Sequence, residues 1–106
     1  MPLIIYTTAP NKKEAKNLAK KLCKRNLAAC VQISKIRSVY VWQNALQDEK
    51  ELSLTIKTTQ RFYKKICKFL RKHHSYEVPE IIAIKPRKVE KHYKKWLGEV
   101  LQRYSS

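Results

Sequence analysis

The chain has 106 residues, which suits one domain over residues 1–106, and 43% of them are hydrophobic, enough for a packed core. It holds 24 Lys and Arg against eight Asp and Glu, for a formal net charge of +16. No run of eighteen apolar residues predicts a membrane-spanning helix, and the first residues do not resemble a secretory signal, so we expect a cytoplasmic protein.

The basic excess suggests anionic partners such as nucleic acid or anionic membranes. Residues 1–60 carry eleven basic and four acidic residues, and residues 61–106 carry thirteen and four. Because no tail holds the excess and no block of five or six consecutive Lys and Arg occurs, a solvated lysine surface is the simpler interpretation. Nonspecific nucleic-acid binding is the alternative.

Three cysteines, Cys23, Cys30 and Cys67, form no CxxC pair. An odd number in an intracellular chain argues against a disulfide framework and against a zinc site built from cysteine pairs. All three are interpreted as small hydrophobic residues, although the Cys30 thiol could bind Cu(I).

Residues 3–8 are apolar and rich in β-branched side chains, which predicts a buried strand. Asn11, followed by Glu14 three residues later, has the pattern of a capping box at a helix start. The apolar residues that follow recur at helical spacing and predict an amphipathic helix of about four turns. That stripe consists of Ala15, Leu18, Ala19, Leu22 and Cys23.

Residues 29–42 predict a long extended stretch whose alternation slips near Lys35, which indicates a bulge or a bend. A turn region follows at residues 43–48, with Asn44 the best candidate for a left-handed conformation. Residues 52–57 alternate strictly and predict a half-buried strand. Together the two strands predict a long hairpin.

An apolar stripe that ends at His73 predicts a second helix over residues 61–73, capped by Thr58 or Thr59. A loop over 75–78 leads to a strand over residues 80–84. A third stripe, from Val89 to Tyr104, predicts a final helix with Gly98 inside it.

The predicted order is βαββαβα, and its first six elements form a ferredoxin-like α+β sandwich. An antiparallel sheet would carry helices on one face, and the last helix is additional. The long hairpin leaves an extended sheet edge that needs a cover. A closed homo-oligomer is therefore expected.

Several stretches, in this order and spacing, match one family. They are YTTAP (6–10), LAACV (27–31), YVW (40–42) with DEKE (48–51), LTIKTT (54–59), HSYEVPEII (74–82) and YKKWL (93–97). Over nearly its full length the chain resembles the CutA divalent-ion tolerance proteins. The resemblance implies a tight homotrimer, similar in architecture to the PII signalling proteins, in which long hairpins pair with neighbouring sheets. It also implies divalent-metal binding, with copper the usual metal, and a signalling or sensing role.

His73 and His74 are the predicted metal residues, with copper as the tentative cofactor, because imidazole is a common copper ligand and the resemblance implies a double-histidine site. The alternative is that both simply end the helix, where histidine interacts favourably with the dipole. The chain departs from the family at Ser75, where proline is usual, and at Thr7, where some bacterial members have a cysteine. It also departs at the hairpin turn, where Gln43-Asn44 replaces an acidic residue and glycine.

A second set of residues gathers at the hairpin and the following loop in such a trimer: Tyr40, Trp42, Lys57, Tyr76 and Glu77. Tyrosine and tryptophan are natural interface anchors, so interface packing is the first interpretation. A small-ligand pocket is the alternative.

No motif for a nucleophile, a P-loop or a metalloprotease occurs, so we expect a protein that is not an enzyme. An RNA-recognition fold would need aromatic residues on its central strands, and residues 51–59 contain none, so no specific nucleic acid is expected. A non-catalytic trimeric scaffold and a small-ligand sensor remain open.

Overall fold

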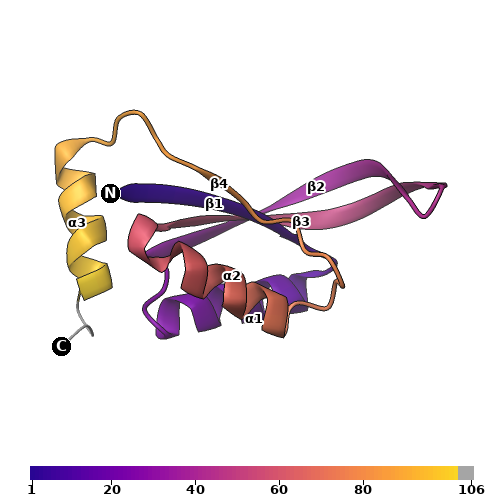
Figure 1. Ribbon diagram of the computed structural model, residues 1–106, viewed down its shortest axis with the longest axis horizontal. Coiled ribbons are helices and arrows are strands. Elements are labelled where there is room, and N and C mark those ends of the chain that lie inside the picture. The colour runs from indigo at the N-terminus through magenta and orange to yellow at the C-terminus, as the bar shows by residue number, and fades with distance from the viewer. Residues whose placement is uncertain (103–106) are drawn as a thin grey trace.

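A computed structural model describes residues 1–102 of the chain (Figure 1). The elements are β1 (Pro2–Ala9), α1 (Lys12–Lys24), β2 (Cys30–Trp42), β3 (Ala45–Thr59), the 3-10 helix η1 (Gln60–Phe62), α2 (Tyr63–His73), β4 (Ile82–Ile84) and α3 (Lys91–Gln102). This is the predicted order. Tyr104, the end of the predicted third stripe, lies outside the described residues.

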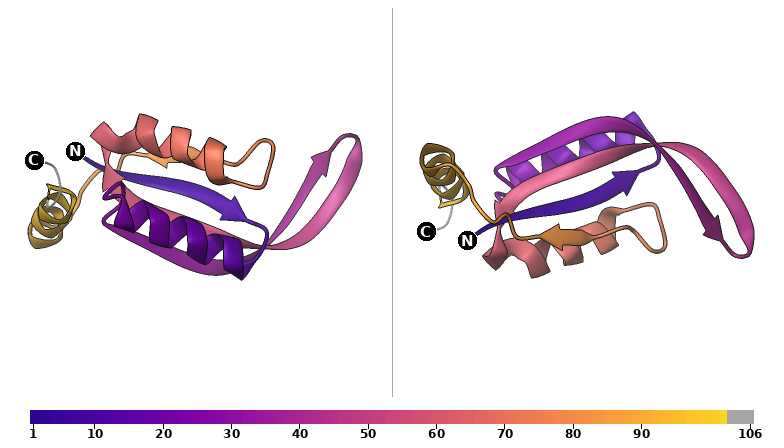
Figure 2. Two further views of the ribbon diagram at one scale, coloured as in Figure 1. Left: turned by 90° about the horizontal axis from the view of Figure 1, so that it is seen from below. Right: turned by 90° about the horizontal axis from the view of Figure 1, so that it is seen from above.

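The four strands form one antiparallel sheet in the order β2-β3-β1-β4. Helices α1 and α2 lie side by side on one face of this sheet, and α3 lies at the end opposite the hairpin tip (Figures 1 and 2). The ferredoxin-like α+β fold with an additional helix is therefore confirmed. Within residues 1–102, no helix is long and apolar enough to cross a membrane.

One hydrophobic core fills the space between the sheet and the two helices, as the periodicities predicted. Its central side chains come from alternate positions of β1 and β3 and from the stripes of α1 and α2. They are Ile5, Leu18, Leu22, Leu54, Ile56, Ile66 and Leu70, and each is fully buried.

The start of α1 follows the predicted cap in part. The Asn11 side chain accepts a hydrogen bond from the backbone N–H of Glu14 at 2.8 Å. The Glu14 carboxylate does not return to Asn11; it accepts instead from the backbone N–H of Ser75, after α2. The carboxylate of the predicted capping box therefore links α1 to the distant loop after α2.

The hairpin pairs without interruption from Cys30 opposite Lys57 to Trp42 opposite Ala45, so a bulge near Lys35 was a wrong prediction. The bend was the correct alternative. Lys35 pairs with Leu52. Of the β3 residues that pair with β1, Leu52 is the one nearest the hairpin tip. Beyond this point the hairpin has two strands, which twist more strongly than a wider sheet, and Figure 2 shows it turning away.

The hairpin turn is shorter than the predicted residues 43–48, because β3 already begins at Ala45. Asn44 has the predicted positive φ, at 64°, and Gln43 shares it at 50°. Two central residues with positive φ define the turn type whose twist matches a hairpin.

Two smaller predictions were wrong. Neither threonine caps α2: Thr58 donates its hydroxyl to the Leu27 carbonyl at 2.6 Å, and Thr59 makes no capping bond. The last strand is limited to Ile82–Ile84 rather than residues 80–84, because at the sheet edge it pairs only with residues 4–6 of β1.

Candidate functional site

The loop that follows α2 is anchored by His74, which is 8% exposed. Its Nε2 lies 2.6 Å from the Thr8 carbonyl oxygen, and its Nδ1 accepts the backbone N–H of Tyr76 at 3.0 Å. A neutral ring with its proton on Nε2 satisfies both bonds. His74 therefore ties the loop to the end of β1.

Glu14 supports the same loop from α1. Its Oε2 accepts from the Ser75 N–H at 3.1 Å and lies 3.3 Å from Nδ1 of His74. The sequence marked Glu14 only as a capping residue, so this role was missed. No local pattern links residues that are 61 positions apart.

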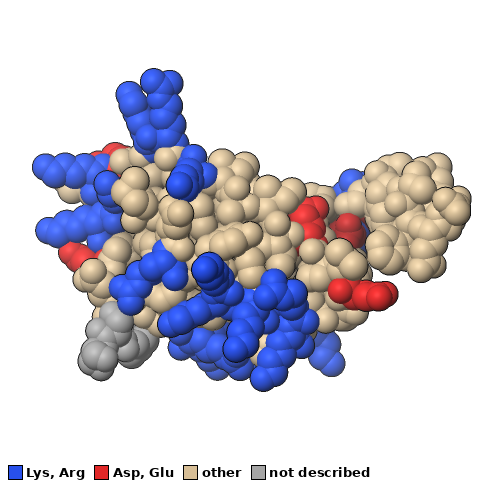
Figure 3. Space-filling model, in the orientation of Figure 1, with Lys and Arg blue, Asp and Glu red and all other residues tan. Residues whose placement is uncertain are grey.

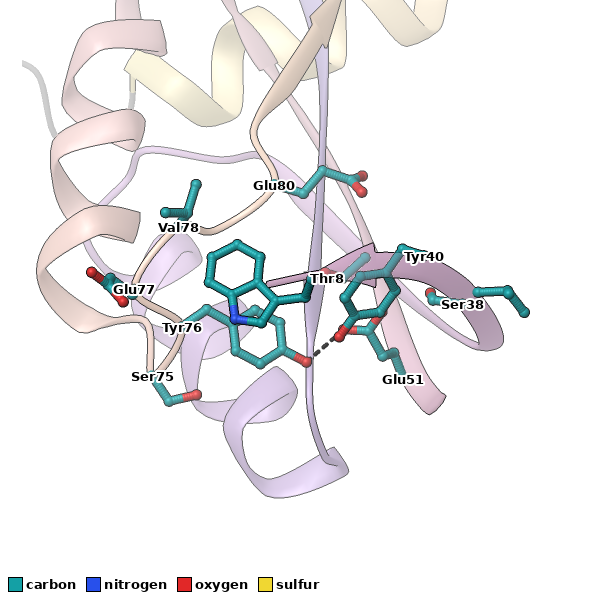
Figure 4. Close-up of a pocket in the computed structure, with 11 residues that line it drawn as sticks. Thr8, Ser38, Tyr40, Glu51, Ser75, Tyr76, Glu77, Val78 and Glu80 are labelled. Atoms are coloured by element: carbon teal, nitrogen blue, oxygen red, sulfur yellow. Dashed lines mark hydrogen bonds between the residues drawn. The ribbon is translucent and has the colours of Figure 1, made fainter. Parts of the chain in front are cut away.

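Two tyrosine hydroxyls donate to carboxylates of β3. Tyr76 bonds Oε2 of Glu51 at 2.5 Å (Figure 4). Tyr40 bonds Oε2 of Glu49 at 3.1 Å. Burial, together with the carboxylate that accepts the bond, raises the pKa of Tyr76 far above its ordinary value and raises the pKa of Tyr40 as well. Both phenols therefore stay protonated and act as donors.

An open cavity of about 690 Å³ lies between the hairpin and this loop. Its aromatic lining residues are Tyr40, Trp42 and Tyr76, and its acidic lining residues are Glu51, Glu77 and Glu80. Among residues 1–102, no Lys or Arg lines it. Four of the five residues predicted to share a pocket are thus brought together.

Lys57, the fifth, lies elsewhere. It pairs with Ile4 and Cys30 near the other end of the sheet, and its Nζ is 5.6 Å from the ring centroid of Tyr93 on α3. Six residues of extended strand, about 20 Å, separate it from Glu51. The alternation of β3 indicates which face of the sheet Lys57 lies on, but not how far along the strand it lies from Glu51.

His73 points to a different part of the molecule from His74. Its ring packs on Phe69, with centroids 4.6 Å apart, and its Nε2 lies 3.4 Å from Nη1 of Arg25, after α1. Burial, and then the positive charges of Lys21, Arg25 and Lys72, lower the pKa of His73. Within residues 1–102, no three His, Cys, Asp or Glu side chains converge on a common point. The double-histidine copper site stays a prediction.

The cysteines and Thr7 lie away from the cavity lining. Cys67 is buried, whereas Cys23 and Cys30 are half-buried, and all three are free thiols. Thr7 is fully buried, and its hydroxyl has no hydrogen-bond partner in the part of the chain that the structure describes. Its neighbour Thr8 is the β1 residue that reaches the cavity.

Carboxylates gather around this cavity, although the chain as a whole is strongly basic. Figure 3 shows a group of Asp and Glu near the base of the hairpin, whereas most of the Lys and Arg in that view lie over the helices and at the end opposite the hairpin. Glu49, Glu51 and Glu80 were not singled out from the sequence, because a glutamate in a strand or loop is usually a solvated residue. A negative patch of this kind attracts cations.

Comparisons with known proteins give the family. The model described as CutA1 divalent ion tolerance protein matches residues 3–100. The divalent-cation tolerance protein CutA of Thermotoga maritima is 36% identical over 97 residues, which are 92% of this chain and 96% of that protein. The chloroplastic protein CutA of Arabidopsis thaliana is 36% identical over 96 residues, 90% of this chain and 53% of that protein.

The solved structure of the periplasmic divalent cation tolerance protein CutA from Archaeoglobus fulgidus has a TM-score of 0.93 and 33% identity. The match covers 95% of this chain and 99% of that one. Because these relatives are named as periplasmic and chloroplastic, a cytoplasmic location stays a prediction. The family match over nearly the whole chain agrees with the fold, and the chain belongs to the CutA1 divalent ion tolerance protein family.

Proposed function

We propose that this chain is a non-catalytic, trimeric protein that binds divalent cations at the base of the β2–β3 hairpin. The observation that carries the proposal is the cavity lined by Glu51, Glu77 and Glu80, in a chain whose net charge is +16. Carboxylates concentrated in one place create a negative potential that draws cations. The names of the relatives, divalent-cation tolerance proteins, support the same class of ligand.

A trimer is supported by the hairpin, which extends well beyond the core (Figure 1). It exposes large apolar side chains, among them Val39, Val41 and Leu46. The outer edge of β2 pairs with no strand among residues 1–102, and such an edge associates readily with a second chain. A closed ring of identical subunits would bury both features.

The proposed trimer also affects which side chains can bind the metal ion. Because no three metal-binding side chains converge within one described chain, the proposal draws the remaining donors from a neighbouring subunit or from water. Copper is the first cation to test, since imidazole suits copper whereas carboxylates alone suit harder ions. His73 has a lowered pKa and offers a neutral ring, but it lies beside Arg25 and away from the cavity, so it would have to come from a neighbouring subunit. Copper at His74 would displace the Tyr76 N–H from Nδ1.

Calorimetric titration of the metal-free protein with Cu²⁺ and with Mn²⁺ tests the proposal. We expect stoichiometric binding by the wild type and its loss in Glu77→Gln/Glu80→Gln, with the trimer mass checked for every sample. A matched control, Glu90→Gln/Glu99→Gln, removes the same charge from the α3 region and should bind normally. If His73→Ala, and not the Glu77 and Glu80 variant, abolishes binding, the histidine is the ligand and the placement of the site at the hairpin base is wrong. Absence of stoichiometric binding to the intact trimer would overturn the proposal.

A small-ligand sensor is the second candidate, favoured by the size of the same cavity. Its volume of about 690 Å³ lies within the range typical of small-molecule sites. A trimer that binds neither cations nor small molecules would instead be a scaffold.

A further inference from the structure

Two helical segments that lie far apart in the sequence carry most of the net charge. Residues 12–25 hold seven basic residues and one acidic residue, and residues 61–73 hold six basic residues and none that is acidic. Their combined charge of +12 is three quarters of the total of +16. The rest of the chain is therefore only weakly basic.

The fold brings these segments together. Helices α1 and α2 lie side by side on the same face of the sheet, and Figure 3 shows Lys and Arg gathered over them (Figures 2 and 3). Twelve of the thirteen basic side chains are exposed, and Lys21 is half-buried. We call this surface, formed by the exposed Lys and Arg of residues 12–25 and 61–73, the α1–α2 face.

The charge of the α1–α2 face is not compensated within the chain. No Lys or Arg of the face forms an ion pair with a carboxylate among residues 1–102. Glu14, the one acid in these segments, is engaged by the Ser75 N–H.

An extended polyanion fits this face better than a small anion does. Helix α1 has 13 residues and is about 20 Å long. A nucleic-acid duplex presents one phosphate charge for about every 1.7 Å of its axis, so a stretch as long as α1 offers about a dozen. Two parallel rows of flexible lysines can follow such a backbone without strict geometry.

The composition of the α1–α2 face also favours one of three candidate polyanions, which are a membrane surface, a single-stranded nucleic acid and a duplex. The only large apolar side chain exposed on the two segments is Tyr63. A helix that inserts into a membrane surface buries a row of apolar residues, and a single-strand binding surface uses aromatic rings on which bases stack. A duplex needs neither, because its phosphates are already exposed.

We propose that the α1–α2 face binds the phosphate backbone of a nucleic-acid duplex without reading its sequence. The proposal does not depend on the cation site, because no basic residue in the described part of the chain lines the cavity at the hairpin base. It also agrees with the strands, where residues 51–59 lack the aromatic side chains that base recognition requires.

The test is fluorescence anisotropy with the full chain and labelled duplexes of about 20 base pairs, as DNA and as RNA, each in two sequences. The face variant is Lys16→Glu/Lys20→Glu/Lys68→Glu, whose three side chains are exposed and make no ion pair or hydrogen bond within residues 1–102. The control variant is Lys88→Glu/Lys91→Glu/Lys94→Glu, which changes the net charge equally outside the face. Oligomer mass and thermal unfolding are checked for each protein.

For the wild type we expect equal affinity for both sequences, and a plot of log K against log salt with a slope of about −4, as for four or five phosphates. The face variant should lose at least about tenfold in affinity at about 100 mM KCl and should have a shallower slope, whereas the control should lose less than about threefold. Binding to only one of DNA and RNA supports the proposal and identifies the source of the duplex.

Other results would overturn the proposal. These are no binding at about 50 mM KCl, equal losses in the face and control variants, or a marked sequence preference. Tighter binding to single strands or to vesicles that contain phosphatidylserine would also overturn it. If charge reversal unfolds the protein, Lys16→Gln/Lys20→Gln/Lys68→Gln is measured instead, and a loss of at least about threefold is expected.

Discussion

Tyr76 donates its hydroxyl to Oε2 of Glu51 across 2.5 Å and so joins the loop after α2 to the middle of β3. The backbone N–H of the same tyrosine donates to His74, and the two rings lie 4.8 Å apart. Glu51 is only 6% exposed, so water can do little to solvate its carboxylate. One tyrosine therefore holds the loop, the strand and the wall of the cavity together.

Tyr76→Phe should lower the free energy of unfolding by about 1–3 kcal/mol, because it leaves a buried carboxylate without its donor. Chemical denaturation at fixed protein concentration measures the loss. Tyr40→Phe is the matched control, since it removes the bond to Glu49, which is exposed. Equal losses in the two variants would show that the burial of Glu51 does not matter.

The two adjacent histidines should differ sharply when each is replaced. His74→Ala removes both hydrogen bonds of a buried ring and should cost about 2–4 kcal/mol. His73→Ala should cost clearly less, because its ring is half-buried and its contact with Arg25 is long. Hydrogen exchange gives a second readout: the amides of Ser75 and Tyr76 should exchange faster only in the His74 variant. Unchanged exchange there would contradict its role as the anchor of the loop.

His73 should titrate below the ordinary histidine pKa of about 6.5, because burial and the neighbouring positive charges disfavour the charged ring. Since the folded pKa is lower than the unfolded one, the unfolded chain takes up the proton first. The contribution of His73 to stability is therefore present above about pH 6.5 and is lost as the pH falls through the folded pKa.

An NMR titration of the ring protons measures this pKa directly. Added salt should raise it part of the way back, because salt screens Lys21, Arg25 and Lys72 but does not change burial. A midpoint at or above 6.5 would contradict the placement of His73 beside the α1–α2 face.

Local patterns in the sequence were enough to predict most of the fold. The period of Leu18 and Leu22, the cap at Asn11 and the alternation of Leu54 and Ile56 each reflect packing or bonding within a single element. Errors arose where a distant element decides the outcome. The alternation in β2 slips at Lys35, which pairs with Leu52, because Leu52 also pairs with the last residue of β1. The end of β1 cannot be predicted from the sequence of β2 alone.

The candidate sites follow the same rule. Tyr40, Trp42, Tyr76 and Glu77 line one cavity of the chain, whereas Lys57 lies about six strand residues away from it, because strand length and not parity sets that distance. Their gathering between subunits stays a prediction. The α1–α2 face was missed for a related reason. The two halves of the chain carry similar charge, so neither stands out, and only the packing of α1 beside α2 brings the two basic segments together.

Gly98 lies inside α3, and a Cβ added to it would meet no atom within 4 Å. Glycine costs about 1 kcal/mol relative to alanine in a helix interior, mainly because the unfolded chain loses more conformational freedom. Gly98→Ala should therefore stabilise the protein by about 0.5–1 kcal/mol, measured by thermal or chemical unfolding. The gain should be the same at every protein concentration, since it comes from the helix and not from association. A destabilised variant whose loss depends on protein concentration would instead mean that a neighbouring subunit occupies the space beside Gly98, and α3 would then belong to the interface of the proposed trimer.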